Sequence, residues 1–166
     1  SLGLAEDTDS TLRQNPVAML RALQTVTEKM LIFCEAGQIK MPKTPSSLSL
    51  LLEKTIVPVA LPKVKGLGHY PAFHPKTWLL QYRSAQGEYR YRLAVLSRNL
   101  TFDTSLDLCV ALRGRPGRAR RKKNKPLADL LAYAAQFAST VKRKAVLELA
   151  EEVGRVADFE VEHPFE

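Results

Sequence analysis

Residues 70–84 read YPAFHPKTWLLQYRS, and this stretch and the segment after it decide the fold. The run from Ala72 to Arg83 is rich in apolar and aromatic residues, which is typical of a strand. The glycine-containing turn SAQGE then predicts a hairpin that leads into a second strand over Tyr89–Arg98. A third strand is predicted over Leu106–Leu112, so this part of the chain should form a sheet.

Helices and short strands are predicted on both sides of these three strands. Asn15-Pro16 is a typical helix start. The predicted helices cover residues 15–29, 47–55, 126–137 and 140–156, and the predicted short strands cover residues 30–36 and 56–61. Pro58 places the second short strand at a sheet edge or at an irregular point. This order of elements predicts an α/β fold with one mixed β-sheet flanked by helices.

A chain of 166 residues suits one domain. We expect a flexible N-terminus over residues 1–12, the domain itself over residues 13–157, and the truncated start of a further segment over residues 158–166. Both cysteines lie in apolar runs, which favours buried free thiols and leaves a disulfide open. No apolar run is long enough for a membrane span, and no signal peptide is seen, so a cytoplasmic location is predicted.

The formal net charge of +8 indicates an anionic partner, either nucleic acid or a membrane surface. Much of this charge lies in the run RGRPGRARRKKNK, which contains eight basic residues and no acidic one. These residues are Arg113, Arg115, Arg118, Arg120, Arg121, Lys122, Lys123 and Lys125. The run could contact a nucleic-acid backbone or form a solvated, flexible loop, and the sequence leaves both alternatives open.

Four polar residues are predicted to meet at one end of the sheet. His74 and Lys76 alternate on one strand and therefore share a face, and Ser97 and Asn99 have the same spacing on the next. Histidine can attack phosphorus or protonate a leaving oxygen, while lysine and asparagine can stabilise charge on non-bridging oxygens. Two cysteines and three scattered histidines do not form a metal-binding pattern, so we predict chemistry without a metal or cofactor.

Taken alone, the tripeptide His74-Pro75-Lys76 is more simply the frayed end of a strand with two solvated side chains. The Ser97-x-Asn99 pattern at the matching place on the next strand favours a phosphodiester site instead. Asp107, like Asp103, is expected to cap the turn after Asn99 rather than to take part in acid–base chemistry.

The chain has H-P-K, followed by a strand, a turn, a second strand and S-R-N. This order resembles one half of the phospholipase D superfamily signature. The resemblance covers about residues 30–112 and is nearest to the tyrosyl-DNA phosphodiesterase-like and bacterial nuclease branches. It implies a phospholipase D-like mixed sheet that is one half of a two-motif fold. It also implies a metal-independent phosphodiesterase in which His74, Lys76 and Asn99 are catalytic and Ser97 is an accessory phosphate ligand.

The chain departs from the superfamily pattern in two ways. Gln81 occupies the place where the usual pattern has an aspartate. The superfamily also uses two motifs, one histidine becoming phosphorylated and the other acting as acid, whereas neither His69 nor His163 begins a second H-x-K. The resemblance therefore implies that the second motif comes from a missing C-terminal half or from a homodimer partner.

The expected function is a phosphodiesterase or nuclease that acts on nucleic acid through a phosphohistidine intermediate, with an incomplete site in this fragment. Two alternatives stay open. The chain could be a nucleic-acid-binding or targeting module of a larger protein with a non-catalytic phosphate site. It could also be half of a phospholipid-acting enzyme.

Overall fold

The chain divides into two units, Ser1–Phe73 and His74–Glu166, in a computed structural model. The structure describes residues 16–39, 47–66, 71–98 and 106–162. The boundary between the units falls just before the His74-Pro75-Lys76 tripeptide, so the candidate site and the strands that follow it belong to the second unit.

The first unit contains a helix–strand–helix–strand arrangement. Its elements are α2 (Pro16–Thr27), β1 (Ile32–Glu35), α3 (Ser47–Glu53) and β2 (Ile56–Val59). The two strands pair in parallel, Ile32 opposite Ile56 and Glu35 opposite Val59. Parallel neighbours need a crossover, and α3 lies within it. A sheet of two strands has only edges, which is where a proline such as Pro58 is tolerated.

The second unit is a four-stranded antiparallel sheet covered by two helices. Its elements are β3 (Thr77–Arg83), β4 (Tyr89–Leu96), β5 (Cys109–Gly114), a 3₁₀ turn η1 (Lys122–Asn124), α4 (Lys125–Ala135), α5 (Thr140–Arg155) and β6 (Phe159–Val161). The strands lie in the order β3-β4-β5-β6. The predicted SAQGE hairpin is confirmed, with Gly87 at φ 81° and the Ser84 N–H donating to the Glu88 carbonyl at 2.8 Å.

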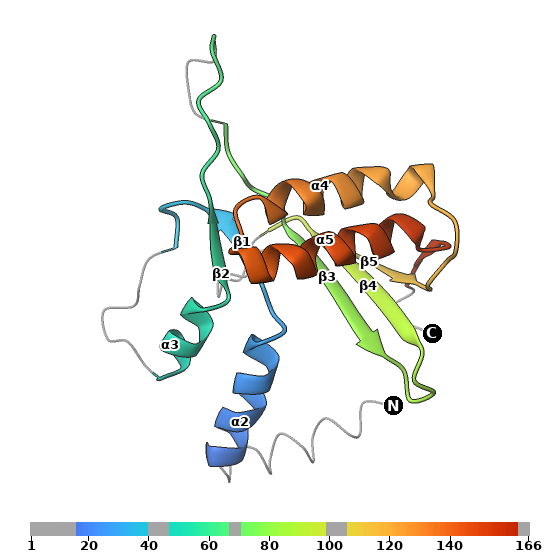
Figure 1. The fold of residues 1–166 in the computed structure, drawn as a ribbon, viewed down its shortest axis with the longest axis horizontal. Coiled ribbons are helices and arrows are strands. Elements are labelled where there is room, and N and C mark those ends of the chain that lie inside the picture. The colour runs from blue at the N-terminus through green and yellow to red at the C-terminus, as the bar shows by residue number, and fades with distance from the viewer. Residues whose placement is uncertain (1–15, 40–46, 67–70, 99–105, 163–166) are drawn as a thin grey trace. The chain divides into compact units, whose positions relative to one another are not determined.

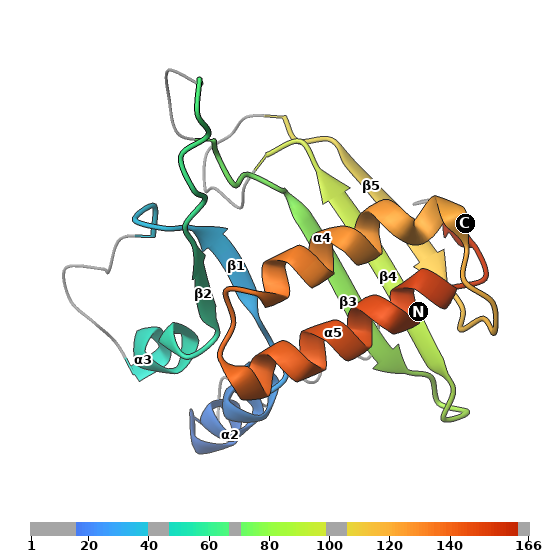
Figure 2. The same ribbon diagram turned by 45° about the horizontal axis from the view of Figure 1, so that its top comes forward.

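Helices α4 and α5 lie side by side across one face of this sheet (Figures 1 and 2). Tyr91, Val153 and Val156 are buried between the layers, and partly buried side chains surround them: Leu79, Leu127, Leu131, Leu149 and Phe159. The opposite face of β3 carries Trp78, Leu80 and Tyr82, which are exposed. Strand alternation explains this division, because successive side chains point to opposite faces.

Three expectations about the strands need correction. Among the described residues, the strands form one parallel and one antiparallel sheet rather than a single mixed sheet. β3 begins at Thr77 instead of Ala72, because Pro75 interrupts the run and has no N–H for a ladder. β4 ends at Leu96 because the chain bends at Ser97, and β5 correspondingly starts at Cys109.

The C-terminal residues also differ from expectation. Residues 158–166 were expected to open a further segment, but Phe159–Val161 pair with β5 as the fourth strand of the same sheet. Cys34 and Cys109 are both free thiols, and Cys109 is exposed rather than buried. Sequence pattern identifies a strand more readily than it identifies the strand's partner, which explains the first difference.

Candidate functional site

The side chains of His74 and Lys76 meet just before β3. Lys76 Nζ lies 3.2 Å from Nδ1 of His74, and a lysine ammonium has only donors, so Nζ donates and Nδ1 accepts. A neutral imidazole that accepts at Nδ1 carries its proton at Nε2. Attack on phosphorus through Nε2 requires the neutral tautomer with its proton at Nδ1, whereas a general acid requires the imidazolium, which carries a proton on both nitrogens.

The sheet brings this pair beside the end of β4. β3 and β4 are antiparallel neighbours, with Thr77 opposite Val95, and the Leu96 N–H donates to the Lys76 carbonyl at 2.8 Å. The start of one strand therefore lies next to the end of the other, as the sequence predicted. Asn99 lies outside the described residues, so its position relative to Lys76 stays a prediction.

Ser97 occupies a defined place at this end of the sheet. Its hydroxyl donates to a carboxylate oxygen of Asp107 and accepts from the Leu108 N–H at 3.0 Å. The same Asp107 oxygen accepts from the backbone N–H groups of Ser97 and Arg98, each at 3.1 Å. We call this arrangement of Ser97, Arg98, Asp107 and Leu108 the clasp, because it joins the two ends of the segment between β4 and β5.

The clasp confirms that Asp107 caps the turn, whereas Asp103 lies outside the described residues. The pKa of the Asp107 carboxyl is lowered, chiefly by the hydrogen bond from the Ser97 hydroxyl, with help from backbone N–H groups. The role of Ser97 as an accessory phosphate ligand stays a prediction. A serine hydroxyl has one proton, so Ser97 cannot donate to a phosphate while it donates to Asp107.

Gln81, which stands where the superfamily pattern has an aspartate, has a structural contact in this chain. Its Nε2 donates to the Tyr91 hydroxyl at 3.2 Å and also to the Glu152 carboxylate. Tyr91 in turn donates to Glu152 at 2.8 Å, and burial is the largest cause of the raised pKa of this phenol. Gln81 therefore links β3 to α5, on the face of the sheet that the helices cover.

This contact lies away from the histidine–lysine pair. Gln81 is five residues beyond Lys76, which is roughly 17 Å along an extended strand. Strand alternation also puts positions 76 and 81 on opposite faces. Gln81 thus contributes to the contact between the sheet and α5, and its position on the strand is distant from Lys76.

The eight basic residues of the run divide into two equal sets. Four of them form ion pairs: Arg113 with Glu162, Arg120 with Glu151, Lys123 with Asp158, and Lys125 with Asp129. The other four, all exposed, have no ion pair within the part of the chain that the structure describes. They are Arg115, Arg118, Arg121 and Lys122.

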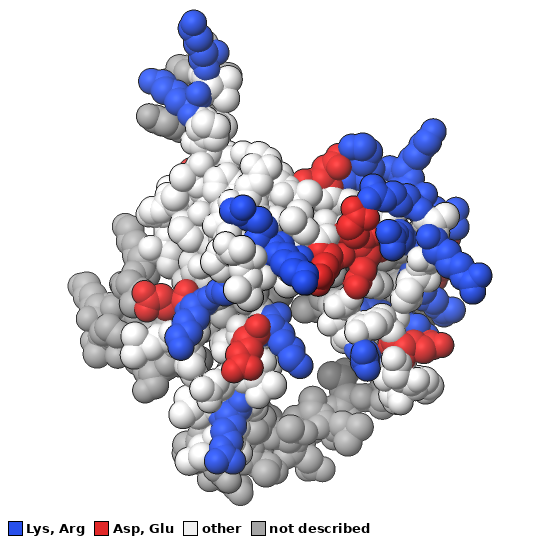
Figure 3. Space-filling model, in the orientation of Figure 1, with Lys and Arg blue, Asp and Glu red and all other residues white. Residues whose placement is uncertain are grey.

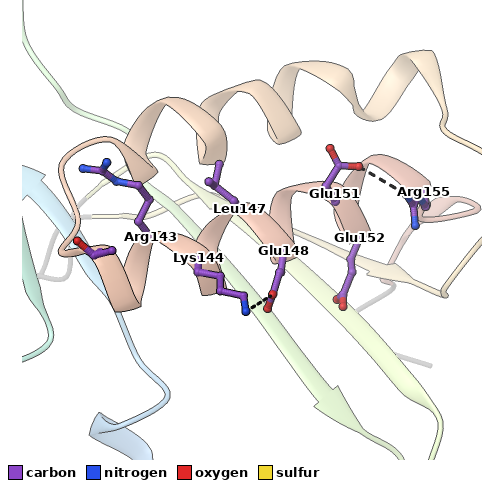
Figure 4. Close-up of a pocket in the computed structure, with 8 residues that line it drawn as sticks. Arg143, Lys144, Leu147, Glu148, Glu151, Glu152 and Arg155 are labelled. Carbon is purple, nitrogen blue, oxygen red and sulfur yellow. Dashed lines mark ion pairs between the residues drawn. The ribbon is translucent and has the colours of Figure 1, made fainter.

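Two surface hollows of the second unit are lined by described residues other than His74 and Lys76. The larger, of about 520 Å³, runs along α5 (Figure 4). Four of its charged side chains form two ion pairs at helical spacing, Lys144 with Glu148 and Arg155 with Glu151. The smaller, of about 180 Å³, is lined by Tyr89, Tyr91, Pro116, Gly117, Glu152 and Arg155.

Within the described ranges, no three His, Cys, Asp or Glu side chains gather in a way that could hold a metal ion. None of the helices in those ranges has the length and apolar character needed to cross a bilayer. Comparison with protein-family models, with curated proteins and with solved structures found no match.

Sequence reasoning missed the contacts that join distant segments. The partner of Gln81 is 71 residues away, and the carbonyls that Asn124 binds are 29 and 32 residues away. No local pattern marks such pairs. The only sequence signal at position 124 is an asparagine just before a predicted helix, which normally suggests a cap for that helix rather than for another one.

Proposed function

We propose that the chain is one half of a phospholipase D-like phosphodiesterase that acts on nucleic acid through a phosphohistidine intermediate. The observation that carries this proposal is the pairing of β3 with β4. It brings the backbone of Lys76 next to Leu96, one residue before the bend at Ser97 where the S-R-N segment begins. The net charge of +8 supports an anionic substrate.

In the proposed reaction, Nε2 of one histidine forms a bond to phosphorus while the bond to the leaving oxygen breaks. A second group donates a proton to that oxygen, because one imidazole cannot be nucleophile and acid in the same step. Water then attacks the phosphohistidine and regenerates the imidazole. The second motif would come from another copy of the chain or from a further segment of a longer protein.

Lys76 has two roles in this scheme. With Nζ on Nδ1, it holds the neutral imidazole with its proton on Nε2, and Nε2 becomes a nucleophile only when that proton moves to Nδ1. When a phosphodiester binds, Nζ can turn to a non-bridging oxygen and stabilise the negative charge there. Asn99 would supply a second donor to the same oxygens. The proposed reaction needs no metal. The proposal also includes a cytoplasmic location.

A nucleic-acid-binding module with a non-catalytic phosphate site is the second candidate function. Two observations favour it: neither of the two hollows described above includes His74, and the hydroxyl of Ser97 is already engaged in the clasp. Such a module would bind oligonucleotides through basic residues of the run at 113–125 and would not hydrolyse them.

Trapping the covalent intermediate separates the two functions. The protein is mixed with bis-p-nitrophenyl phosphate in excess chelator, quenched in alkali and digested, and the peptide that contains His74 is weighed by mass spectrometry. We expect an acid-labile phosphoryl adduct in the wild type and in Lys144→Met, which removes an exposed lysine from α5. We expect none in His74→Asn and a strongly reduced yield in Lys76→Met. An unmodified peptide at every protein concentration would favour the module.

A further inference from the structure

The loop between β5 and α4 is held in place by the C-terminal end of α5. We call residues 115–122 the basic arch. The Ala157 N–H donates to the Arg115 carbonyl at 3.0 Å, and the Arg121 N–H donates to the Gly154 carbonyl at 2.8 Å. The backbone at Gly117 passes so close to α5 that a Cβ there would lie 2.1 Å from the Arg155 carbonyl oxygen. Backbone hydrogen bonds thus hold the arch at both of its ends to the C-terminal end of α5 and the residues just after it.

Its charge points outward and is mostly uncompensated. Lys and Arg side chains gather over the loop between β5 and α4 and over the adjoining end of α5 (Figure 3). Within the arch, Arg120 pairs with Glu151. The four others, which lack an ion pair in the described part of the chain, are Arg115, Arg118, Arg121 and Lys122. Arg121 does contribute, after Lys123, to the lowered pKa of Asp158.

The arch and the histidine–lysine pair lie at opposite ends of the sheet. Gly114, just before the arch, is opposite Tyr91, which is opposite Gln81 at the far end of β3. His74 and Lys76 precede the near end. Five residues of strand separate the two ends by roughly 17 Å. Along one strand of B-form DNA this separation corresponds to about five phosphates.

We propose that the basic arch is a second phosphate-binding surface, which holds the backbone of a polynucleotide several nucleotides away from the phosphate at His74. This inference rests on the proposed function and narrows its substrate from any phosphodiester to a polynucleotide. A mononucleotide-sized diester can reach only one end of the sheet. A polynucleotide of sufficient length can occupy both and gain affinity from the four unpaired cations.

A polynucleotide fits the arch better than a membrane surface does. Proteins that bind membranes through basic residues usually insert apolar side chains beside them. Apart from the basic residues, the arch contains only Pro116, Gly117 and Ala119, and none of the large exposed apolar residues of the chain lies in it. Cations at a helix C-terminus also stabilise the helix. If this were their only role, removing them would leave the affinity for nucleic acid unchanged.

The test compares two variants that lose the same charge. R115Q/R118Q/R121Q/K122Q removes the unpaired cations of the arch, and R113Q/K123Q/K125Q/K144Q removes four ion-paired cations that lie outside it. Binding of a fluorescent single-stranded oligonucleotide of about twelve nucleotides, and of one of about three, is measured by anisotropy over a range of salt concentrations. Circular dichroism confirms folding, and hydrolysis of bis-p-nitrophenyl phosphate is followed in parallel.

We expect the arch variant to lose about tenfold or more in affinity for the longer oligonucleotide, with a salt slope shallower by up to about 3, at ~0.7 per contact. The short oligonucleotide should bind alike to all proteins, and the matched control should keep its affinity for the longer one.

Equal losses in both variants would reduce the effect to net charge and overturn the proposal, as would no loss in either. Binding of phosphatidylserine vesicles lost only in the arch variant, with oligonucleotide affinity intact, would replace the polynucleotide by a membrane. Absence of diester hydrolysis in every protein would count against the proposed enzyme alone, because the binding result stands without it.

Discussion

The hydroxyl of Ser97 donates to the carboxylate of Asp107, ten residues further along the chain. This bond and the two backbone N–H groups on the same oxygen tie the end of β4 to the start of β5. Ser97 and Arg98 on one side and Asp107 and Leu108 on the other are therefore held together. The single hydroxyl proton of Ser97 is committed to Asp107 in this arrangement.

The clasp should open in acid. Its hydrogen bonds favour ionised Asp107 and lower the pKa of that carboxyl in the folded protein. Their contribution to stability is therefore complete above the ordinary range of an aspartate and is lost as the pH falls through the lowered value. In an NMR titration, the Ser97 amide should stay constant through that ordinary range and shift only below it. Ser97→Ala should raise the pKa of Asp107 towards its usual value. Titration of wild-type Asp107 at the usual value would contradict the clasp.

Local pattern predicted most helices and strands of the second unit and the hairpin between β3 and β4. The signals were local ones: the apolar run after Lys76, the glycine of SAQGE, and the two helical stretches after Pro126. The contact between His74 and Lys76 followed from the same logic, since alternate residues of an extended segment share a face.

Partners and strand ends were not predictable in this way. The bend at Ser97 depends on Asp107, and the fourth strand depends on pairing between β5 and β6, which lie 45 residues apart between Gly114 and Phe159. The division of the basic run into paired and unpaired residues depends on acids in α4, in α5 and after it, such as Glu151 and Asp158. These choices are made by tertiary packing and leave no trace in the local sequence.

Introducing at position 81 the aspartate of the phospholipase D pattern should harm this chain. Gln81→Asp places a carboxylate beside Glu152, where the native amide donates a hydrogen bond. We expect a loss of up to about 1 kcal/mol, or ~2–4 °C in Tm, that shrinks at high salt because the groups are exposed. Gln81→Met, which adds no charge, should show no salt dependence of its loss. Faster diester hydrolysis by Gln81→Asp would mean that position 81 serves the reaction after all.

Asn124 should be one of the most sensitive positions of the second unit. It is buried, and its Nδ2 donates to the carbonyls of Val153 and Val156 at the end of α5, at 3.1 and 2.8 Å. Asn124→Ala should cost about 1–3 kcal/mol in the free energy of unfolding. Asn124→Asp should cost more, because a carboxylate has no proton for either carbonyl. Urea denaturation measures both, with Gln136→Ala as an exposed control that should change stability by less than ~0.5 kcal/mol.

Two glycines near the end of α5, Gly117 in the arch and Gly154 in the helix itself, should respond in opposite directions to the same added methyl group. At Gly117 a Cβ would lie 2.1 Å from the Arg155 carbonyl oxygen, which is backbone and cannot rotate away. Gly117→Ala must therefore displace the arch, at a cost of about 1–3 kcal/mol. At Gly154 the new Cβ would lie 3.8 Å from Cβ of Ala128, an ordinary contact. Gly154→Ala should be neutral or stabilising by up to about 1 kcal/mol, because alanine has a higher helix propensity than glycine.

Thermal unfolding measures the stability of both variants, and oligonucleotide affinity should fall in Gly117→Ala alone. A Gly117→Ala protein as stable as the wild type, with unchanged affinity, would show that the arch does not need its close approach to α5.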